Sequence, residues 1–275
     1  MNLKPETQNS KVITSKDNSL LRQARAVRDG KAVDLIFVEG LRLCEEAYRS
    51  GLDIEAVFYS DEIALKERAA EVISKLGQVC ERLAVVTEAL LATISYTKTP
   101  QGIIALAGRP ESGELPLDNK KKEPPLLVVL HALNNPVNVG AILRSAEAAG
   151  VSGVITTGHT ADPFSPKALR GAMGSAFRLP IWHGPEYSDV VQWCAKNNIQ
   201  TVCADLDAKL SHTQFDWRTP SALIVGPEST GLSRDEAGMA SAAIRIPMRG
   251  EVESLNVAAA ATIVLYEAAR QRGQS

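Results

Sequence analysis

The sequence predicts an α/β protein with two domains, the second built on a largely parallel sheet. Short apolar runs alternate with segments of helical periodicity along most of the chain. A proline-rich segment without periodicity, 109–125, interrupts this alternation, and the run at 126–130 is apolar throughout, as in strands buried on both faces. We therefore predict a smaller α/β domain at 10–108, a linker at 109–125 and a larger α/β domain at 126–275.

The composition is that of a globular protein with no strong charge bias. Of 275 residues, 45% are hydrophobic and 23% charged, and the net charge is −2, so any contact with nucleic acid has to use a local basic patch. The four cysteines are far apart and form no Cys-x-x-Cys pair, which argues against a disulfide scaffold and a cysteine-rich zinc site. The first residues lack the apolar core of a signal peptide, and the apolar run after Asn256 is too short to cross a bilayer. We expect a cytoplasmic or organelle-matrix protein that contacts no membrane.

The first thirty residues are polar and form the most basic part of the chain, with Arg22, Arg25 and Arg28 close together. Two interpretations are open. The basic residues are either the solvated face of a helix or an arm that contacts RNA phosphates without base specificity.

The rest of the first domain alternates strands and helices. Strands are expected at 35–38, 54–59, 83–86 and 102–107, and helices at 41–51 and 63–76. No catalytic constellation stands out among these residues, so we expect this domain to bind a ligand or partner.

The second domain is expected to contain four or five buried strands, at 126–130, 151–157, 199–204, 222–225 and 243–246. The helix after the first of them is expected to be capped by Asn138. Arg144 lies off its apolar face, where an ion pair with Glu147 is the alternative to a functional role. A last helix is expected from 257 onward, capped by Asn256.

Basic residues also gather at 164–178. Lys167, Arg170 and Arg178 lie there with no acidic residue between them. A helix start rich in small residues with local positive charge is suited to hold an anion.

Three polar, glycine-bearing loops follow buried strands, at 134–140, 226–231 and 247–256. Loops at the carboxyl ends of parallel strands gather at one edge of a sheet, where ligands bind. The sequence has no P-loop, no Gly-x-Gly-x-x-Gly fingerprint and no Gly-x-Ser-x-Gly elbow. Its four histidines are scattered, so we expect ordinary turn or surface residues and no metal site. These patterns alone indicate a phosphate- or nucleotide-like ligand.

Three ordered motifs make a specific resemblance. Asn-x-Gly-x-x-x-Arg at 138–144, Ile-Val-Gly-Pro-Glu-Ser-Thr-Gly-Leu-Ser at 224–233 and Ile-Pro-Met-x-Gly-x-Val-Glu-Ser-Leu-Asn at 246–256 resemble those of the SpoU/TrmH family. These are RNA 2′-O-ribose methyltransferases of the SPOUT superfamily that use S-adenosyl-L-methionine (AdoMet). Residues 37–42 and 100–103 resemble the family's amino-terminal substrate-binding domain.

The resemblance implies a SPOUT-type sheet with a carboxyl-terminal trefoil knot, and a homodimer. It assigns backbone contacts to AdoMet to Gly226, Ile246 and Leu255. The polar active-site set that it implies is Asn138, Arg144, Glu228, Ser254 and Asn256. Pro227 departs from the small or polar residue of many members and removes an N–H from that loop.

Arg144 matches the arginine proposed as the family's general base. Arginine stays protonated in proteins, which favours a second role, a clamp on the phosphate beside the target ribose. The resemblance also suggests that this arginine completes the partner's site.

The function implied is 2′-O-methylation of structured RNA, with ribosomal RNA favoured by the complete substrate-binding domain. Arg22, Arg25, Arg28, Lys167 and Arg170 are the expected RNA contacts. The alternatives are a tRNA 2′-O-methyltransferase, a non-catalytic RNA-binding or ribosome-assembly protein of the same fold, and a sugar-nucleotide or dinucleotide enzyme on an ordinary doubly wound fold.

Overall fold

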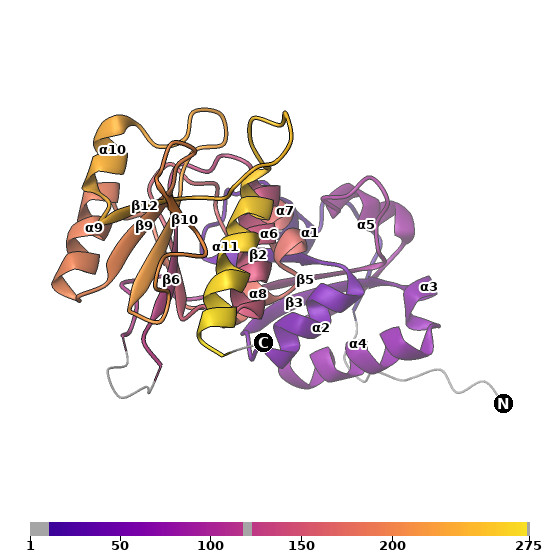
Figure 1. The fold of residues 1–275 in the computed structure, drawn as a ribbon. Helices are drawn as coiled ribbons and strands as arrows, with labels where there is room; N and C mark the ends of the chain where they lie inside the picture. The colour runs from indigo at the N-terminus through magenta and orange to yellow at the C-terminus, as the bar shows by residue number, and fades with distance from the viewer. Residues whose placement is uncertain (1–10, 118–122, 274–275) are drawn as a thin grey trace. The chain divides into compact units, whose positions relative to one another are not determined.

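The computed structural model describes residues 11–117 and 123–273 (Figure 1). The chain divides into two compact units, unit 1 being Met1–Pro110 with Phe164–Phe177, and unit 2 being Glu111–Pro163 with Arg178–Ser275. Residues 118–122 of the expected linker, and residue 10, lie outside the described residues. The segment Phe164–Phe177 groups with unit 1, although its place in the sequence suggests the second domain.

Unit 1 is built on a mixed five-stranded sheet. In sheet order its strands are β1 (Lys11–Ile13), β4 (Leu83–Val86), β3 (Ile54–Ser60), β5 (Ile103–Gly108) and β2 (Leu35–Glu39). The first three are parallel to one another, and β5 runs antiparallel to both of its neighbours. The helices of this unit are α1 (Ser19–Arg28), α2 (Leu41–Arg49), α3 (Asp61–Ala64), α4 (Glu67–Val79), α5 (Glu88–Ile94) and α7 (Pro166–Ala172).

One sequence prediction for unit 1 needs correction, and one open interpretation can be compared with the structure. The helix expected at 63–76 is two helices, α3 and α4, because Lys66 between them has an extended backbone with ψ 123°. The basic segment near the amino terminus contains helix α1, which agrees with the interpretation of a helix with one solvated face. This helix buries Leu21, Ala24 and Val27 against the face of the sheet that α5 also covers.

Unit 2 is built on a seven-stranded sheet in which all neighbouring strands are parallel. In sheet order its strands are β10 (Leu210–Ser211), β12 (Ala242–Arg245), β9 (Gln200–Ala204), β11 (Ser221–Val225), β6 (Leu126–Leu130), β7 (Gly153–Thr156) and β8 (Ile181–His183). The α/β fold class is confirmed, but four or five strands was too few. Strands β8 and β10 are too short to give a recognisable apolar run.

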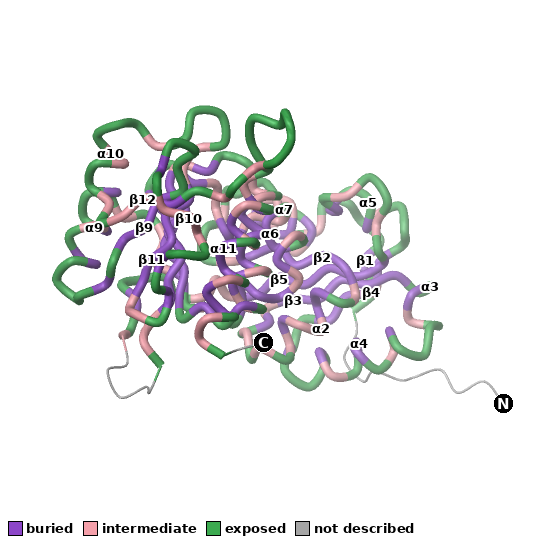
Figure 2. The backbone as a smooth tube through the Cα atoms, viewed as in Figure 1, coloured by how far each residue is buried: buried purple, intermediate pink, exposed green. Residues whose placement is uncertain are grey.

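Helices cover both faces of this sheet (Figures 1 and 2). They are α6 (Pro136–Ala148), α9 (Tyr187–Lys196), α10 (Arg234–Met239) and α11 (Val257–Gln271). The residues of the short helix α8 (Ser175–Arg178) are divided between the two units. Side chains alternate along each strand. Leu127 and Val129 therefore join the cluster that contains Trp193 of α9. Helices α6 and α11 pack against each other, and Ser145 and Thr262 share a hydrogen bond of 2.8 Å between them.

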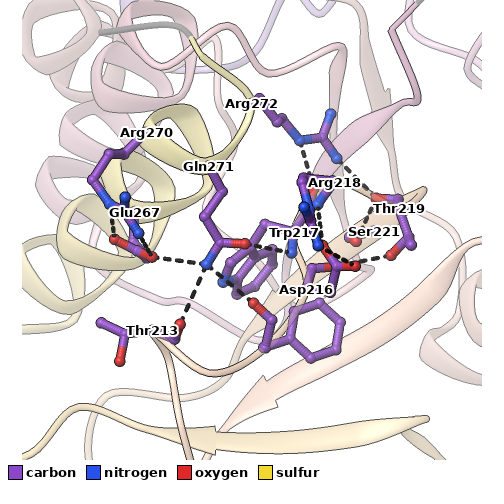
Figure 3. A network of polar contacts seen from close by, with 11 residues as sticks. Thr213, Asp216, Trp217, Arg218, Thr219, Ser221, Glu267, Arg270, Gln271 and Arg272 are labelled. Atoms are coloured by element: carbon purple, nitrogen blue, oxygen red, sulfur yellow. Dashed lines mark hydrogen bonds and ion pairs between the residues drawn. The ribbon is translucent and has the colours of Figure 1, made fainter.

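The carboxyl end of α11 is anchored to the segment before β11 (Figure 3). Gln271 accepts the backbone N–H of Trp217 at 3.0 Å and donates to the carbonyl of Phe215 at 3.1 Å. Arg272 donates to the carbonyls of Trp217 and Thr219 at 2.7 and 2.9 Å, and also to that of Pro124. Burial lowers the pKa of the Arg272 guanidinium. Because the far end of α11 is fixed, its amino terminus is held in place as well.

Among the described residues, no helix combines the length and the apolar composition needed to traverse a bilayer.

A buried histidine connects the carboxyl end of β6 to α10. His131 follows β6 and is 8% exposed, so the expectation of a turn or surface residue was wrong. Its Nδ1 lies 2.9 Å from Thr157 Oγ1 and its Nε2 lies 2.9 Å from Glu236 Oε1. Glu236 also accepts the N–H of Ser233 at 2.7 Å, completing a capping box for α10. Hydrogen bonds from Ser233, together with His131, lower the pKa of the Glu236 carboxyl to about 2.

We expect Glu236→Gln to lower the free energy of unfolding at pH 7 by about 1 kcal/mol, because charge-assisted hydrogen bonds become neutral ones. The folded-state pKa lies below the ordinary value of 4.5. The stabilisation is therefore complete above pH 4.5 and is lost as the pH falls towards 2. Urea denaturation between pH 7 and pH 3 should show the difference between wild type and variant closing with acid. The control Glu71→Gln, on an exposed pair with Lys75, should cost only a few tenths of a kcal/mol. A difference in unfolding free energy between wild type and Glu236→Gln that stays constant down to pH 3 contradicts this account.

Candidate functional site

Three of the polar loops meet at the carboxyl edge of the unit 2 sheet. They follow β6, β11 and β12, and β6 and β11 are direct neighbours while β9 alone separates β11 from β12. Because all these strands are parallel, the loops after them leave the same edge. The structure thus brings together segments more than a hundred residues apart.

Asn138 of α6 links all three loops through its side-chain amide. Its Nδ2 donates to Glu228 Oε1 at 2.6 Å, and its Oδ1 accepts from Asn256 Nδ2 at 3.3 Å. The orientation of the amide follows from chemistry, because an ionised Glu228 can only accept. The Oδ1 of Asn256 is already used by helix α11, so its Nδ2 is the group that faces Asn138. Residues from the loops after β11 and β12 are thereby joined through one side chain on α6.

The helix caps explain which asparagines are free for this bridge. Asn256 caps α11 as predicted, since its Oδ1 accepts the N–H groups of Ala258 and Ala259 at 2.9 and 3.3 Å. The prediction that Asn138 caps α6 was wrong. Asn135 does so, accepting the N–H of Val137 at 3.0 Å, and Pro136 occupies the first turn. Asn138 lies inside the first turn, and its side chain is therefore available to the other loops.

A cavity of about 510 Å³ lies beside this bridge, within the size range of small-molecule sites. Its lining comes from the ends of β9 and β11, the loops after β9, β11 and β12, and α11. Buried apolar side chains form one side: Cys203, Leu223, Val225, Ala261 and Val264. Burial also raises the pKa of the Cys203 thiol, so it stays a neutral lining group.

The polar part of the lining is acidic. It includes Asp205, Asp207, Glu228 and Glu253, all exposed, and no lysine or arginine occurs among the described residues that line the cavity. An arrangement of one charge sign raises the local concentration of ligands of the opposite sign. The cavity is therefore suited to a small cation that carries an apolar group. Asp205 and Asp207 were missed from the sequence, although their position directly after β9 matches that of the recognised loops.

Gly226 is held tightly where β11 enters its loop. A Cβ at this position would lie 2.9 Å from Leu232 Cγ and 3.1 Å from Leu232 N, and the backbone nitrogen cannot move aside easily. The proline at 227 does not open the loop, because the carbonyl of Pro227 accepts the N–H of Gly231 at 3.0 Å. Gly231 itself has φ +64°, which favours glycine. The loop is a compact turn whose residues 226–232 all line the cavity.

The other predicted site residues do not all lie at the cavity. Ser254 and Leu255 line the cavity, whereas Ile246 is not among the described residues that do. Arg144 is exposed on α6, and the described contacts give it no hydrogen bond or ion pair. The alternative of a pair with Glu147 was wrong, because Glu147 pairs with Arg178 of α8. Because Arg178 is paired with Glu147, its guanidinium is not available to the anion site that was expected at 164–178.

The predicted RNA contacts lie in unit 1. Lys167 and Arg170 are exposed on α7, a helix too short to form an anion site at its own start. Arg22 is exposed on α1, but its two neighbours have structural contacts. Arg25 donates to the carbonyl of Lys16 at 2.9 Å, and Arg28 donates to those of Thr93 and Ser95 at 3.1 and 3.3 Å.

Comparisons with known proteins agree with this geometry. The chain is 32% identical over 244 residues to the 23S rRNA (uridine(2479)-2′-O)-methyltransferase of Streptomyces viridochromogenes, covering 86% of this chain and 82% of the relative. It is 29% identical over 231 residues to the 23S rRNA (guanosine(2553)-2′-O)-methyltransferase RlmP of Bacillus subtilis, covering 83% and 86%. The crystal structure of an AdoMet-bound rRNA methyltransferase from Sinorhizobium meliloti matches with a TM-score of 0.82 and 30% identity, over 95% of this chain and 98% of that one.

Both parts of the sequence also match known families. Residues 18–105 match the MRM3-like substrate binding domain, and residues 125–266 match the SpoU rRNA methylase family. The resemblance read from the three ordered motifs is confirmed. The chain belongs to the SpoU rRNA methylase family.

Proposed function

We propose that this protein transfers the methyl group of AdoMet to the 2′-hydroxyl of a ribose in ribosomal RNA. The observation that carries the proposal is the cavity of unit 2, lined by the loops after β11 and β12 and bridged by Asn138. The relatives from Streptomyces viridochromogenes and Bacillus subtilis are 23S rRNA 2′-O-methyltransferases, and they differ in whether uridine or guanosine is the target. The chemistry on the ribose is therefore shared, while the choice of base is set separately.

The cavity fits AdoMet in both polarity and charge. Its apolar side, with Leu223 and Val225 among its residues, suits an adenine ring. The carboxylates of Asp205, Asp207 and Glu253 suit a ligand that carries ammonium and sulfonium charges. Gly226 and Leu255, from the loops after β11 and β12, also line the cavity. When bound there, AdoMet supplies an electrophilic methyl group on its sulfonium sulfur.

The protein's own task is to position the ribose and manage its charge. The 2′ oxygen has to approach the methyl carbon in line and lose its proton, and positioning alone can supply about 7–11 kcal/mol of barrier reduction. We assign Arg144 to the phosphate beside the target ribose, since a permanently protonated, exposed guanidinium suits that contact. Glu228 and Ser254 line the cavity, and Asn256 is joined to Glu228 through Asn138.

We further propose that the active form is a homodimer in which Arg144 serves the site of the partner. Helix α11 carries two exposed apolar side chains, Ile263 at 39% and Tyr266 at 53%, on the helix whose amino terminus reaches the cavity. A second copy covering them would pack on α11, against which α6 lies in each copy. The trefoil knot implied by the resemblance stays a prediction.

Analysis of RNA nucleosides tests the proposed reaction. Ribosomal RNA incubated with the protein and AdoMet carrying a labelled methyl group should yield a labelled 2′-O-methyl nucleoside after digestion. Gly226→Ala should abolish most of this product, because the added Cβ collides with Leu232 and distorts the cofactor loop. Gly238→Ala is the matched control, since a Cβ at that position meets no atom within 4 Å. Label on a base, or no label with a folded wild-type protein, contradicts the proposal.

Mixed dimers test whether Arg144 acts in the partner's site. Homodimers of Arg144→Ala and of Asn256→Ala should each be nearly inactive. In a heterodimer of the two, one site carries both lesions, and the other combines an intact Arg144 with an intact Asn256. Differently tagged chains purified as the heterodimer should regain up to about half of wild-type activity if the sites are independent. A heterodimer that binds AdoMet and RNA but stays inactive contradicts the shared site.

A further inference from the structure

Unit 1 contains a polar groove that no feature of the proposed reaction uses. Its volume is about 500 Å³, and it lies between the loop from α5 to β5 and the helix α7. The lining residues are six consecutive loop residues and one arginine: Tyr96, Thr97, Lys98, Thr99, Pro100, Gln101 and Arg170. All of them belong to unit 1.

A buried carboxylate at the end of β2 fixes this loop. Glu39 is 5% exposed and accepts from the Ser95 hydroxyl, from the N–H of Tyr96 at 3.0 Å and from Thr97 Oγ1 at 2.9 Å. Burying a carboxylate is costly unless hydrogen bonds satisfy it. Here the loop supplies all three of these bonds, so a loop that moved away would leave a buried charge without partners. The loop conformation is therefore strongly favoured over its alternatives.

A second charged residue holds the same loop from α1. The Arg28 guanidinium donates to the carbonyls of Thr93 and Ser95, at the end of α5 and the start of the loop. At the other end, Gly102 has φ +81°, and a Cβ there would lie 2.8 Å from Ile63. The loop is thus held at its start by Glu39 and Arg28 and is closely packed at its end, at Gly102. Such rigidity lowers the entropy cost of binding a ligand.

The groove presents one aromatic ring and two cations to solvent. Tyr96 is 44% exposed, and Lys98 and Arg170 are exposed as well. Neither cation forms a hydrogen bond or an ion pair with the residues that the structure describes, and none of the described lining residues is acidic. Aromatic rings that stack on bases, beside cations that contact phosphates, are the usual means of holding unpaired nucleotides.

We propose that this groove binds an unpaired nucleotide of the RNA substrate, with Tyr96 stacked on its base and Lys98 and Arg170 at the flanking phosphates. The proposal rests on the proposed function in that the RNA is the substrate of unit 2. It assigns the first domain a defined contact site in place of the basic face of α1, where Arg25 and Arg28 already bind backbone carbonyls.

The test measures binding of a single-stranded RNA oligonucleotide to the full chain by fluorescence anisotropy at several salt concentrations. Tyr96→Ala should weaken binding about tenfold at constant salt dependence, because stacking is not ionic. The double variant Lys98→Gln, Arg170→Gln should reduce the slope of log Kd against log salt by about 1.4, corresponding to two lost phosphate contacts. The double variant Arg49→Gln, Lys66→Gln removes the same charge from unit 1 outside the groove and should change the slope by much less.

Methylation assays separate this proposal from the proposed function. With methylation intact in the wild type, the groove variants should raise the KM for RNA by more than they lower kcat, with AdoMet affinity unaltered. If both groove variants keep the Kd, the salt slope and the KM of the wild type, the groove proposal is overturned. That result does not contradict the proposed methyltransferase activity. A wild type that binds RNA through the groove but forms no 2′-O-methyl nucleoside overturns the proposed function alone.

Discussion

The candidate site depends on the side-chain amide of Asn138, which among the described residues hydrogen-bonds to side chains from both of the other motif loops. A side-chain amide carries a donor nitrogen and an acceptor oxygen on one carbon, and here Glu228 accepts from the nitrogen while Asn256 donates to the oxygen. Neither a carboxylate nor a hydroxyl offers the same fixed pair in one plane. Asn135 caps α6, which leaves the side chain of Asn138 available for the bridge, and Gln271 and Arg272 anchor the carboxyl end of α11. Contacts at these helix ends therefore support the elements that carry the bridge.

The cavity of unit 2 and the groove of unit 1 carry charges of opposite sign, which the net charge of −2 conceals. The cavity of unit 2 is lined by Asp205, Asp207, Glu228 and Glu253 and by no described cation, which suits a cationic cofactor. The groove of unit 1 has the opposite composition and suits a polyanion. Arg144 is the exposed cation on α6, the helix that also carries Asn138. Such a division lets one chain attract AdoMet and RNA to different surfaces.

Sequence patterns predicted the elements whose signal is local. The apolar strands β6 and β11 and the cap of α11 by Asn256 were predicted correctly because each depends on a few neighbouring residues. Strands β8 and β10 were missed because three and two residues carry no periodicity. The cap of α6 was misassigned, although Pro136 at the first helical turn indicates Asn135.

Features that depend on distant parts of the chain were not visible in the sequence. His131 is buried because Thr157 and Glu236 approach it from other elements, and a lone histidine in a sequence gives no sign of that. The ordered motifs did identify the family, but not that Asp205 and Asp207 join its cavity. The grouping of Phe164–Phe177 with unit 1 likewise has no local signal. The homodimer, the knot and the individual site roles stay predictions.

The most direct test of the central claim is a double-mutant cycle on AdoMet binding, measured by calorimetry with Glu228→Ala and Asn256→Ala. These residues lie on different loops and are joined through Asn138, so their effects on the binding free energy should be non-additive by about 0.5–3 kcal/mol. The subtraction removes the separate cost of losing the cap of α11. The cycle is then repeated with the substitution Asn138→Ala added to each of its four proteins. The coupling energy between Glu228 and Asn256 should then fall close to zero. Additive effects in the presence of Asn138, or equal coupling without it, contradict a site assembled by this amide.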